Sequence, residues 1–342
     1  MNKVFLGKTG IKISKIGFGV LPMGASQMDL TIEEGSELIR YALSKGINFF
    51  DTAEYYDTYK YMKPGFDAYF RDAAQADTLN SSFAAAAQRL CDMPVISSKC
   101  LSGSYKEMKN AVSDALSQLG RDMIDIFLLH EVYSPEDFIS RRGAWEYLKE
   151  AKKQGIIRAI GISTHHQDVC LYVADIKDCD VVFPLINKDG LGIRNGLGPG
   201  SAKDMSAAIN KCYANGKGVF AMKVFGGGNL AAEYRECLDY VSSIEGVDAM
   251  VIGFTKKEEI DRAAEYAEGT LAEDYVPDMR NKKMFISQDD CIGCLSCKNR
   301  CPNNAVYINK NGLCDIDHSV CLTCGYCAPI CPVRALIMID HT

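Results

Sequence analysis

Two cysteine-rich runs near the end of the chain carry the most specific chemical signal in the sequence. The pattern Cys-x2-Cys-x2-Cys-x3-Cys-Pro occurs at residues 291–302 and again at residues 321–332. In such a pair of runs, three thiolates of each run hold one [4Fe-4S] cluster, and the fourth thiolate ligates the cluster of the other run. The spacing therefore predicts one cluster held by Cys291, Cys294, Cys297 and Cys331, and a second held by Cys321, Cys324, Cys327 and Cys301.

Zinc is the alternative metal for these cysteines, because Cys-x2-Cys pairs also form tetrahedral zinc sites. Three cysteines in series, followed by a fourth cysteine and a proline, favour iron–sulfur clusters, since both runs share the whole pattern. The length of the chain and its N-terminus, which does not have the pattern of a signal peptide, further indicate reduced thiols rather than a disulfide framework.

Three charged side chains and one phenol lie at or near the ends of predicted strands in the first 130 residues. Asp51, Lys99 and His130 each end such a strand, and Tyr56 lies five residues after Asp51. A tyrosine whose pKa is near 10 is a poor acid–base catalyst at neutral pH, but a neighbouring ammonium group lowers that pKa. We therefore expect Lys99, paired with Asp51, to activate Tyr56, while His130 orients a substrate oxygen.

Each of these residues also has a structural explanation when it is taken alone. Asp51 is suited to cap a helix, Lys99 to form a solvated charge at a rim, and His130 to be a satisfied loop histidine. Their common position at the ends of successive predicted strands favours the catalytic interpretation, because such ends converge on one face of a barrel.

Short apolar or β-branched runs alternate with longer amphipathic segments from about residue 11 to residue 265, which indicates repeated βα units. Eight such repeats match a (β/α)8 TIM barrel, whose usual size is about 250 residues. The expected strands are residues 16–20, 47–51, 95–99, 124–129, 159–163, 181–185, 219–223 and 249–253. The expected helices include residues 31–45, 105–119, 145–154 and 206–215, most of them followed by a glycine.

A polar stretch at residues 269–283, with Pro277 and little apolar periodicity, is predicted to be a linker. It divides an α/β barrel at residues 1–268 from a small α+β region at residues 284–342 that carries both cysteine runs. Within the barrel, residues 57–82 are rich in Tyr, Phe and Ala. They are expected either to cover the active site or to form a surface helix.

Composition and charge exclude several classes of protein. Of 342 residues, 47% are hydrophobic and 24% are charged, as in an ordinary globular protein. The formal net charge is -6 and no basic block stands out, so nucleic acid is not an expected partner. No apolar run approaches the ~20 residues of a membrane-spanning helix, so we expect no membrane association and a cytoplasmic protein.

Residues 3 to about 265 resemble the aldo-keto reductase family. The motifs that carry the resemblance are Gly-Lys-Thr-Gly at 7–10, Ile-Gly-Phe-Gly at 16–19, Asp-Thr-Ala-Glu-Tyr-Tyr at 51–56, Ile-Ser-Ser-Lys at 96–99, Ile-Asp-Ile-Phe-Leu-Leu-His at 124–130 and Ile-Gly-Ile-Ser at 160–163. The resemblance implies that a nicotinamide cofactor delivers hydride to a carbonyl carbon while Tyr56 protonates the oxygen, with Tyr55 as the alternative. Residues 284–342 resemble a bacterial ferredoxin with two [4Fe-4S] clusters.

The family resemblance also implies a set of cofactor-binding residues, in which this chain shows departures. Thr164 stands where the family has an asparagine, Phe183 where a glutamine is usual, and Met222 where an aromatic ring often stacks on nicotinamide. Residues 253–259 place acids where members that use NADP have an arginine, so the choice between NAD(H) and NADP(H) is open. The implied cofactor-binding residues are Gly19, Ser163, Thr164, Asn187, Lys223, Gly226, Gly227, Thr255 and Lys256.

The leading interpretation is an oxidoreductase that interconverts a small-molecule carbonyl and alcohol with a nicotinamide cofactor. Two [4Fe-4S] clusters would couple it to one-electron carriers, so an electron-carrier protein is an expected partner. Hydride transfer moves two electrons whereas each cluster carries one, and two alternatives therefore stay open. One is a barrel reductase fed by cluster electrons without nicotinamide. The other is a non-enzymatic electron-transfer or redox-sensing protein.

Overall fold

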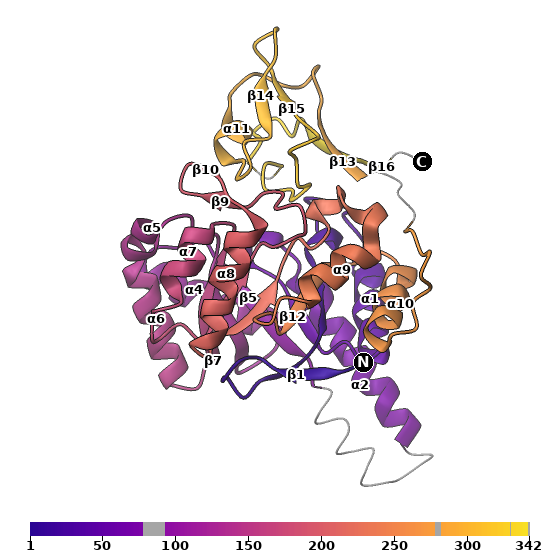
Figure 1. Cartoon of the computed structure of the whole chain (residues 1–342). Coiled ribbons are helices and arrows are strands. Elements are labelled where there is room, and N and C mark those ends of the chain that lie inside the picture. Colours follow the sequence, from indigo (N-terminus) through magenta and orange to yellow (C-terminus); the bar gives the residue numbers. More distant parts are fainter. Residues whose placement is uncertain (78–92, 278–281, 329, 341–342) are drawn as a thin grey trace.

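The computed structural model describes residues 1–77, 93–277, 282–328 and 330–340. Eight parallel strands close into a barrel in the order β11-β12-β3-β4-β5-β6-β7-β8, and helices surround them (Figure 1). This confirms the predicted (β/α)8 TIM barrel. The barrel strands are β3 (Ile16–Gly19), β4 (Phe49–Asp51), β5 (Val95–Cys100), β6 (Ile124–Leu129), β7 (Ile157–Thr164), β8 (Val181–Pro184), β11 (Gly218–Ala221) and β12 (Ala249–Gly253).

All eight barrel strands lie where the sequence predicts them, with small differences at their ends. β6 and β12 have the expected bounds. β7 begins two residues before the expected start, and β11 ends at Ala221, two residues before the expected end. Lys223 therefore lies in the loop after β11, where its backbone adopts a left-handed φ of 60°.

Apolar side chains from different strands fill the interior of the barrel. Phe49 of β4 meets Phe220 of β11 edge to face, with ring centroids 4.9 Å apart, and Phe220 stacks on Phe183 of β8 at 4.3 Å. The hairpin of β1 (Lys3–Phe5) and β2 (Lys12–Ser14) packs into the same core and covers the N-terminal end of the barrel (Figure 1). The opposite end, where the strands finish, is the one that carries the predicted site residues.

The helices around the barrel begin and end at recognisable signals. α1 (Ile32–Ser44) follows Thr31, which forms a capping box with Glu34. α4 (Tyr105–Leu119) is followed by Gly120, whose left-handed φ of 62° ends the helix as expected. None of the described helices has the length and apolar character needed to cross a membrane. The barrel region also contains α5 (Pro135–Ser140), α6 (Arg142–Lys153) and α10 (Lys257–Glu268), and the C-terminal region contains α11 (Ser296–Arg300).

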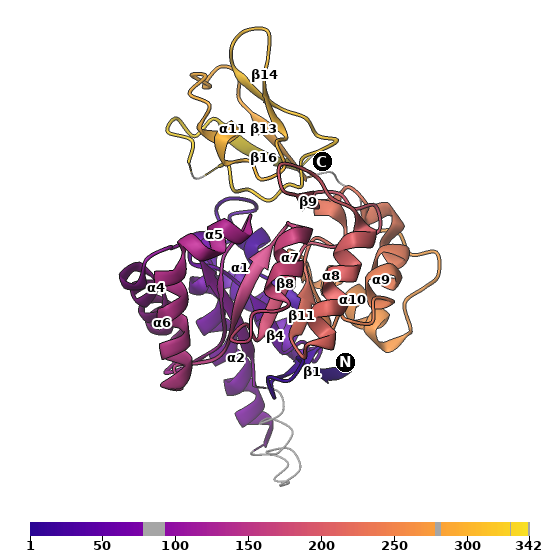
Figure 2. The ribbon, with the colours of Figure 1, turned by 60° about the vertical axis from the view of Figure 1, so that its left-hand side comes forward.

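The helix α2 (Tyr59–Asp77) accounts for most of the expected segment 57–82. It packs against α1 and α4 and runs toward the end of the barrel opposite to the C-terminal region (Figures 1 and 2). Its described residues thus form a surface helix, which is one of the two alternatives predicted for this segment. Residues 78–82 lie outside the described part of the chain.

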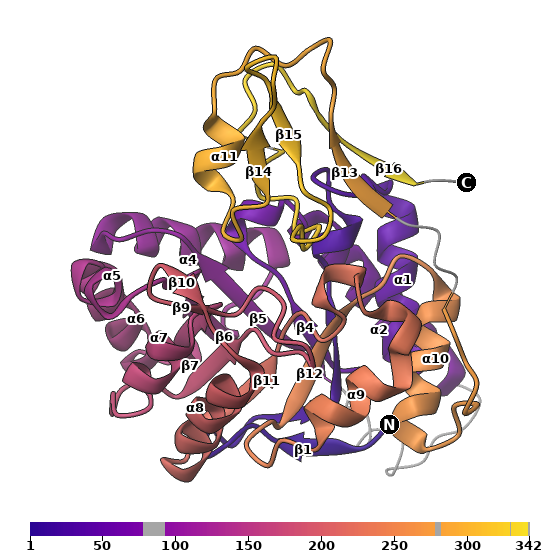
Figure 3. The same cartoon turned by 45° about the horizontal axis from the view of Figure 1, so that its top comes forward.

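The C-terminal region is a small α+β unit seated over the C-terminal ends of the barrel strands (Figures 1 and 3). β13 (Lys282–Ile286) pairs antiparallel with β16 (Leu336–Asp340), and β14 (Val306–Ile308) pairs antiparallel with β15 (Cys314–Ile316). Because β13 begins at Lys282, it includes the last two residues of the expected linker. Residues 278–281 of that linker lie outside the described part of the chain.

Candidate active site

The four residues predicted to carry the chemistry meet at the C-terminal end of the barrel. Asp51 ends β4, and Lys99 lies near the end of β5. His130 follows β6, and Tyr56 ends the short 3-10 helix Glu54–Tyr56. All four residues are buried, and Lys99 and His130 are each only 1% exposed. The structure therefore places these residues in one site.

Lys99 is held by a carboxylate and by the backbone. Its Nζ donates to Asp51 Oδ2 at 2.7 Å and to the Thr52 carbonyl oxygen at 2.6 Å. The same nitrogen lies over the Tyr56 ring, 5.0 Å from its centroid. Burial lowers the pKa of Lys99 and raises that of Asp51, and the ion pair between them opposes both shifts.

The pKa of Tyr56 corrects one expectation. Burial raises this pKa well above its usual value, and the Asp51 carboxylate adds to the rise. The expectation of a pKa below the usual value is wrong for this structure, because burial and the Asp51 carboxylate outweigh the nearby ammonium of Lys99, which makes its hydrogen bonds to Asp51 and Thr52. Tyr56 is therefore a neutral phenol, able to donate a proton across the neutral pH range.

His130 is a neutral imidazole beside the Tyr56 hydroxyl. Its Nε2 lies 3.4 Å from Tyr56 Oη. Burial lowers the pKa of His130 well below its usual range, and the cations Lys99 and Arg300 lower it further. A neutral imidazole can share a hydrogen bond with a phenol or with a substrate oxygen.

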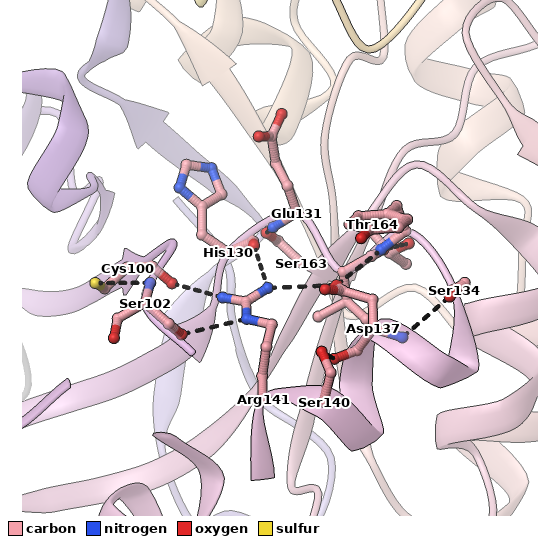
Figure 4. A network of polar contacts seen from close by, with 12 residues as sticks. Cys100, Ser102, His130, Glu131, Ser134, Asp137, Ser140, Arg141, Ser163 and Thr164 are labelled. Carbon is pink, nitrogen blue, oxygen red and sulfur yellow. Dashed lines mark hydrogen bonds and ion pairs between the residues drawn. The ribbon is translucent and has the colours of Figure 1, made fainter. Parts of the chain in front are cut away.

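Arg141 fixes the backbone that carries His130, a role that the sequence analysis did not identify. Its guanidinium donates to the carbonyl oxygens of His130 at 2.8 Å, Cys100 at 3.0 Å and Ser102 at 3.2 Å (Figure 4). Since Cys100 ends β5 and His130 follows β6, this side chain ties together the ends of two barrel strands. The sequence carries no signal for it, because all three partners are backbone atoms distant along the chain.

Tyr326 enters the same site from the C-terminal region. Its hydroxyl lies 3.1 Å from Tyr56 Oη and 3.4 Å from His130 Nε2, and its ring stacks on the Tyr56 ring with centroids 6.3 Å apart. The residue is 3% exposed. Tyr326 lies between two cysteines of the second run, at the position that Ser296 holds in the first run. The two runs share only their cysteines and the proline that follows, so this difference gives no signal for Tyr326 in the sequence.

An ion pair and a backbone contact fasten the C-terminal region beside Tyr326. Arg300 pairs with Glu131 at 2.7 Å, and the Arg300 guanidinium lies 4.9 Å from the centroid of the Tyr326 ring. Burial raises the pKa of Glu131, although Arg300 opposes the rise. Tyr55 Oη donates to the Tyr326 carbonyl oxygen at 3.0 Å. The phenol of Tyr55 therefore helps to bind the C-terminal region to the barrel.

A cavity of about 370 Å³ adjoins Tyr56 and lies between the barrel and the C-terminal region. Its walls include Asp51, Tyr56 and Phe183 from the barrel and Cys321 and Tyr326 from the C-terminal region. A cavity of this size is typical of a site for a small molecule or part of a cofactor. Of the residues implied as cofactor-binding, those that line the cavity are Gly19, Lys223, Gly227, Thr255 and Lys256.

The other implied cofactor-binding residues make contacts within the barrel. The Ser163 hydroxyl accepts a hydrogen bond of 2.9 Å from a backbone N–H of the loop after β6, and the Thr164 hydroxyl donates to a carbonyl oxygen of that loop at 2.6 Å. The Asn187 amide makes two hydrogen bonds of 2.9 Å to the backbone of Leu191. Gly226 is buried beside the Leu191 side chain. Ser163, Thr164 and Asn187 therefore fasten loops.

The glycine loop at Gly226–Gly228, which includes two of the implied cofactor-binding residues, lies against the second cysteine run. A Cβ atom at Gly227 would collide with the backbone of Leu322, and Gly227 has a left-handed φ of 70°. Asn229 Nδ2 donates to the Cys321 carbonyl oxygen at 3.0 Å. Glycine is thus required at this close approach of the C-terminal region to the barrel.

The carboxylate of Glu259 accepts hydrogen bonds from two backbone amides at the start of α10. Its Oε2 accepts from Thr255 N at 2.6 Å and from Lys256 N at 3.1 Å. A helix N-terminus is a favourable position for an anion because its N–H groups and the helix dipole both point there. Here the chain supplies that anion itself.

The second cysteine run comes together with one residue of the first run. The residues around one small cavity of the C-terminal region include Cys301, Cys321, Cys324 and Cys327. These are the four residues that the spacing assigns to one cluster, and four thiolates around one cavity suit that group. In both runs a backbone N–H donates to the last sulfur at 3.2 Å, from Ala305 to Cys301 Sγ and from Ala335 to Cys331 Sγ. Hydrogen bonds to the sulfur ligands tune the reduction potential of an iron–sulfur cluster.

The two cysteine runs differ in their position relative to the barrel. Leu322 of the second run is 2% exposed, whereas the equivalent Ile292 of the first run is 62% exposed. Cys294 of the first run is also exposed, and Cys297 is buried. In the part of the chain that the structure describes, no three His, Cys, Asp or Glu side chains converge on a single metal-ion position. The second run is therefore the one next to the active site.

Comparison with known families establishes what kind of protein carries this site. The aldo/keto reductase family matches residues 15–242, more than half of the chain. The chain belongs to the aldo/keto reductase family. Its C-terminal region matches the 4Fe-4S dicluster domain at residues 283–332. The chain thus combines a TIM barrel of this family with a ferredoxin-like domain.

Curated relatives agree with both matches. L-galactose dehydrogenase from Arabidopsis thaliana is 27% identical over 184 residues, which cover 50% of this chain and 50% of that protein. 6-dehydroglucose reductase from Novosphingobium aromaticivorans is 28% identical over 172 residues, or 48% of this chain and 51% of that protein. The chain spans about half the length of these barrel relatives. Pyruvate synthase subunit PorD from Methanothermobacter marburgensis is 41% identical over 59 residues, or 17% of this chain and 68% of PorD.

Solved structures agree on the fold of the barrel. An aldo-keto reductase from Bacillus halodurans, solved in its holo form, superposes with a TM-score of 0.59 at 18% identity. The superposition covers 82% of this chain and 99% of that chain. At this identity the likeness shows the fold alone.

Proposed function

We propose that the protein interconverts a small-molecule carbonyl and alcohol at Tyr56 and His130 with a nicotinamide cofactor, and that two [4Fe-4S] clusters couple this reaction to one-electron carriers. The observation that supports the coupling is the 3.1 Å contact between the hydroxyl groups of Tyr56 and Tyr326. Since two of the predicted cluster ligands flank Tyr326, the acid–base group of the barrel and a cluster-binding loop belong to one site.

The side chains of the barrel have distinct roles in this proposal. Tyr56, kept neutral by burial, donates a proton to the carbonyl oxygen, and neutral His130 orients that oxygen. Lys99 lies over the Tyr56 ring and stabilises the negative charge that develops when the proton leaves, while Asp51 holds Lys99 in place. The C-terminal region shields the phenol from water, because Tyr56 is 7% exposed beneath it.

The cavity beside Tyr56 is the proposed place for the cofactor. Nicotinamide supplies hydride to a carbonyl carbon when it is bound, and the clusters supply or accept single electrons. The residues that would hold the cofactor are those of the implied set that line the cavity, namely Gly19, Lys223, Gly227, Thr255 and Lys256.

Anaerobic titration of the purified holoprotein with NADH and NADPH, followed by turnover assays with a panel of aldehydes and ketones, tests the proposal. We expect at least one cofactor to bind and to be oxidised by at least one carbonyl. We also expect the visible absorption of the clusters to bleach on reduction with dithionite. Binding of a cofactor without turnover of any carbonyl would instead favour the electron-transfer or redox-sensing role.

A barrel reductase fed by the clusters without nicotinamide is the second candidate. The backbone hydrogen bonds of Ser163, Thr164 and Asn187 favour it, because the family resemblance implies that these side chains bind the cofactor. In this reaction the carbonyl takes up two electrons, one from each reduced cluster, and two protons, one of them from Tyr56. Dithionite-reduced protein, freed of excess reductant, should then be reoxidised by an added carbonyl. A reduced spectrum that persists after the addition would exclude this candidate.

A further inference from the structure

The C-terminal region supplies a third polar group to the site formed by Tyr56 and His130. The Tyr326 hydroxyl lies 3.1 Å from Tyr56 Oη and 3.4 Å from His130 Nε2, and those two atoms lie 3.4 Å from each other. The three atoms form a small triangle in which the Tyr326 oxygen contacts both of the others. All three side chains are buried.

A substrate oxygen needs the same two partners as the Tyr326 hydroxyl. In the proposed reaction Tyr56 protonates the carbonyl oxygen and His130 orients it, so that oxygen must lie within hydrogen-bond distance of both groups. Two oxygen atoms cannot hold one position between the same pair of partners. We propose that Tyr326 occupies the substrate-oxygen position as a built-in competitor, and that a carbonyl reaches Tyr56 and His130 only when the Tyr326 side chain withdraws. This inference rests on the proposed function.

Several contacts hold the Tyr326 side chain in that position. The Arg300 guanidinium lies 4.9 Å from the ring centroid and is paired with the buried carboxylate of Glu131. Tyr55 Oη donates to the Tyr326 carbonyl oxygen, and the Tyr56 ring stacks on the Tyr326 ring. The residue is therefore bound at its hydroxyl, its ring and its backbone.

Space for the withdrawal adjoins the Tyr326 ring. Tyr56 and Tyr326 both line the cavity of about 370 Å³, so in the absence of bound cofactor a change of rotamer can carry the Tyr326 hydroxyl away from His130 into that space. The backbone of this loop also carries Cys324 and Cys327. Rotation of the side chain leaves these predicted cluster ligands in place, whereas movement of the whole loop would displace them.

Ligand binding in the absence of any reductant tests the competition directly. Ligand-observed fluorine NMR gives the affinity of the anaerobic holoprotein for 4-fluorobenzaldehyde. Tyr326→Phe removes the competing hydroxyl but keeps the ring, and it should tighten binding about five- to tenfold. Arg300→Lys keeps the charge opposite Glu131 but loses the planar contact with the ring, and it should tighten binding by a smaller factor. The matched control is Tyr307→Phe, at a tyrosine of the same region that is 45% exposed, and it should bind as the wild type does.

Steady-state kinetics separate a competitor from a proton donor. Removal of a competitor should lower KM by the same factor as the dissociation constant and leave kcat within about twofold. A lower kcat at unchanged KM in Tyr326→Phe would overturn the proposal, and so would equal affinity of Tyr326→Phe and the wild type.

Iron and sulfide content shows whether each variant retains its clusters. If Tyr326→Phe loses them, the affinity of Arg300→Lys decides the question, and an unchanged affinity overturns the proposal. If the variants bind the aldehyde more tightly but neither they nor the wild type turn over any carbonyl, the inference stands and the proposed function fails.

Discussion

The hydroxyl oxygens of Tyr56 and Tyr326 lie 3.1 Å apart, although 270 residues separate the two tyrosines in the sequence. Both side chains belong to a small buried cluster with Ala53 and Cys324. Because Cys324 is assigned to the second iron–sulfur cluster, a predicted cluster ligand packs in the same group as the predicted catalytic phenol. Changes in the C-terminal region should therefore be visible in the chemistry of the barrel.

Removal of the Tyr56 hydroxyl should show in turnover rather than in substrate binding. Tyr56→Phe should lower kcat for carbonyl reduction by roughly 10²- to 10⁴-fold and change KM far less, because the proton moves only in the transition state. The matched control is Tyr55→Phe, which loses a hydrogen bond to the Tyr326 backbone and should keep much of the turnover. A larger loss of kcat in Tyr55→Phe would transfer the role to Tyr55.

Cys301 and Cys331 should each serve the cluster of the other run. Cys301→Ala should damage the cluster assigned to the second run, because Cys301 shares a cavity with the cysteines of that run. Iron and sulfide per chain should fall by about half, and the EPR signal of the other cluster should remain. Cys331→Ala is the matched variant and should remove that other signal. Stoichiometric zinc with no visible absorption would contradict both clusters.

The barrel and its four candidate catalytic residues could be predicted from the sequence because they depend on local patterns. A strand that is buried on both faces appears as a continuous apolar run, as in residues 126–129 of β6. A charged residue directly after such a run, such as Asp51 or His130, marks the end of the strand. Convergence of these residues follows because all parallel strands of a barrel finish on one side.

Tyr326 and Arg141 could not be predicted in the same way. Tyr326 is a spacer between cysteines, and no local pattern distinguishes a spacer that faces solvent from one that docks on another region. Arg141 acts through three carbonyl oxygens that only the folded loops bring together. The raised pKa of Tyr56 results from burial and from Asp51, and the burial of a side chain is a property of the folded structure.

Arg141 should support both stability and turnover. Its side chain is 8% exposed, and Arg141→Met would leave the carbonyl oxygens of His130, Cys100 and Ser102 without this donor. We expect the free energy of unfolding to fall by roughly 2–4 kcal/mol and kcat to fall with it, because His130 loses its anchor. The control is Arg142→Met at the neighbouring position, which is 82% exposed. Equal losses in the two variants, measured by denaturant unfolding and kinetics, would contradict this role.

Asp248 should make the stability of the barrel fall as pH rises through its raised pKa. Its Oδ2 accepts from Gly7 N at 3.1 Å and from Val219 N at 2.9 Å, and burial raises the pKa of Asp248 to about 6. Between about pH 4, the usual pKa of an aspartate, and this value, the folded protein binds a proton that the unfolded chain does not. The free energy of unfolding therefore decreases as pH rises across that window.

The variant Asp248→Asn isolates this contribution, because it keeps an acceptor oxygen for both amides and removes the titration. Its free energy of unfolding should lack the decrease that the wild type shows between about pH 4 and pH 6. Anaerobic denaturant unfolding of both proteins at several pH values across this window provides the measurement. Parallel pH profiles for the two proteins would assign the pH dependence to other groups.

The start of α10 should set the preference between the two nicotinamide cofactors. Glu259 already accepts hydrogen bonds from the amides of Thr255 and Lys256, where a phosphate would otherwise be favoured. A 2′-phosphate carries close to two negative charges and would meet this carboxylate, without the bidentate arginine partner that strengthens phosphate binding. We therefore predict that NADH binds at least as tightly as NADPH.

Isothermal titration of the anaerobic protein measures both affinities. Glu259→Gln keeps an acceptor for the two amides but removes the charge, so it should improve the affinity for NADPH relative to NADH. Glu258→Gln, at the exposed neighbouring position, should change the ratio less. Markedly tighter binding of NADPH by the wild type would refute this electrostatic argument. Absence of binding by either cofactor would favour reduction of the substrate by the clusters, since the cavity beside Tyr56 would then be free for the carbonyl itself.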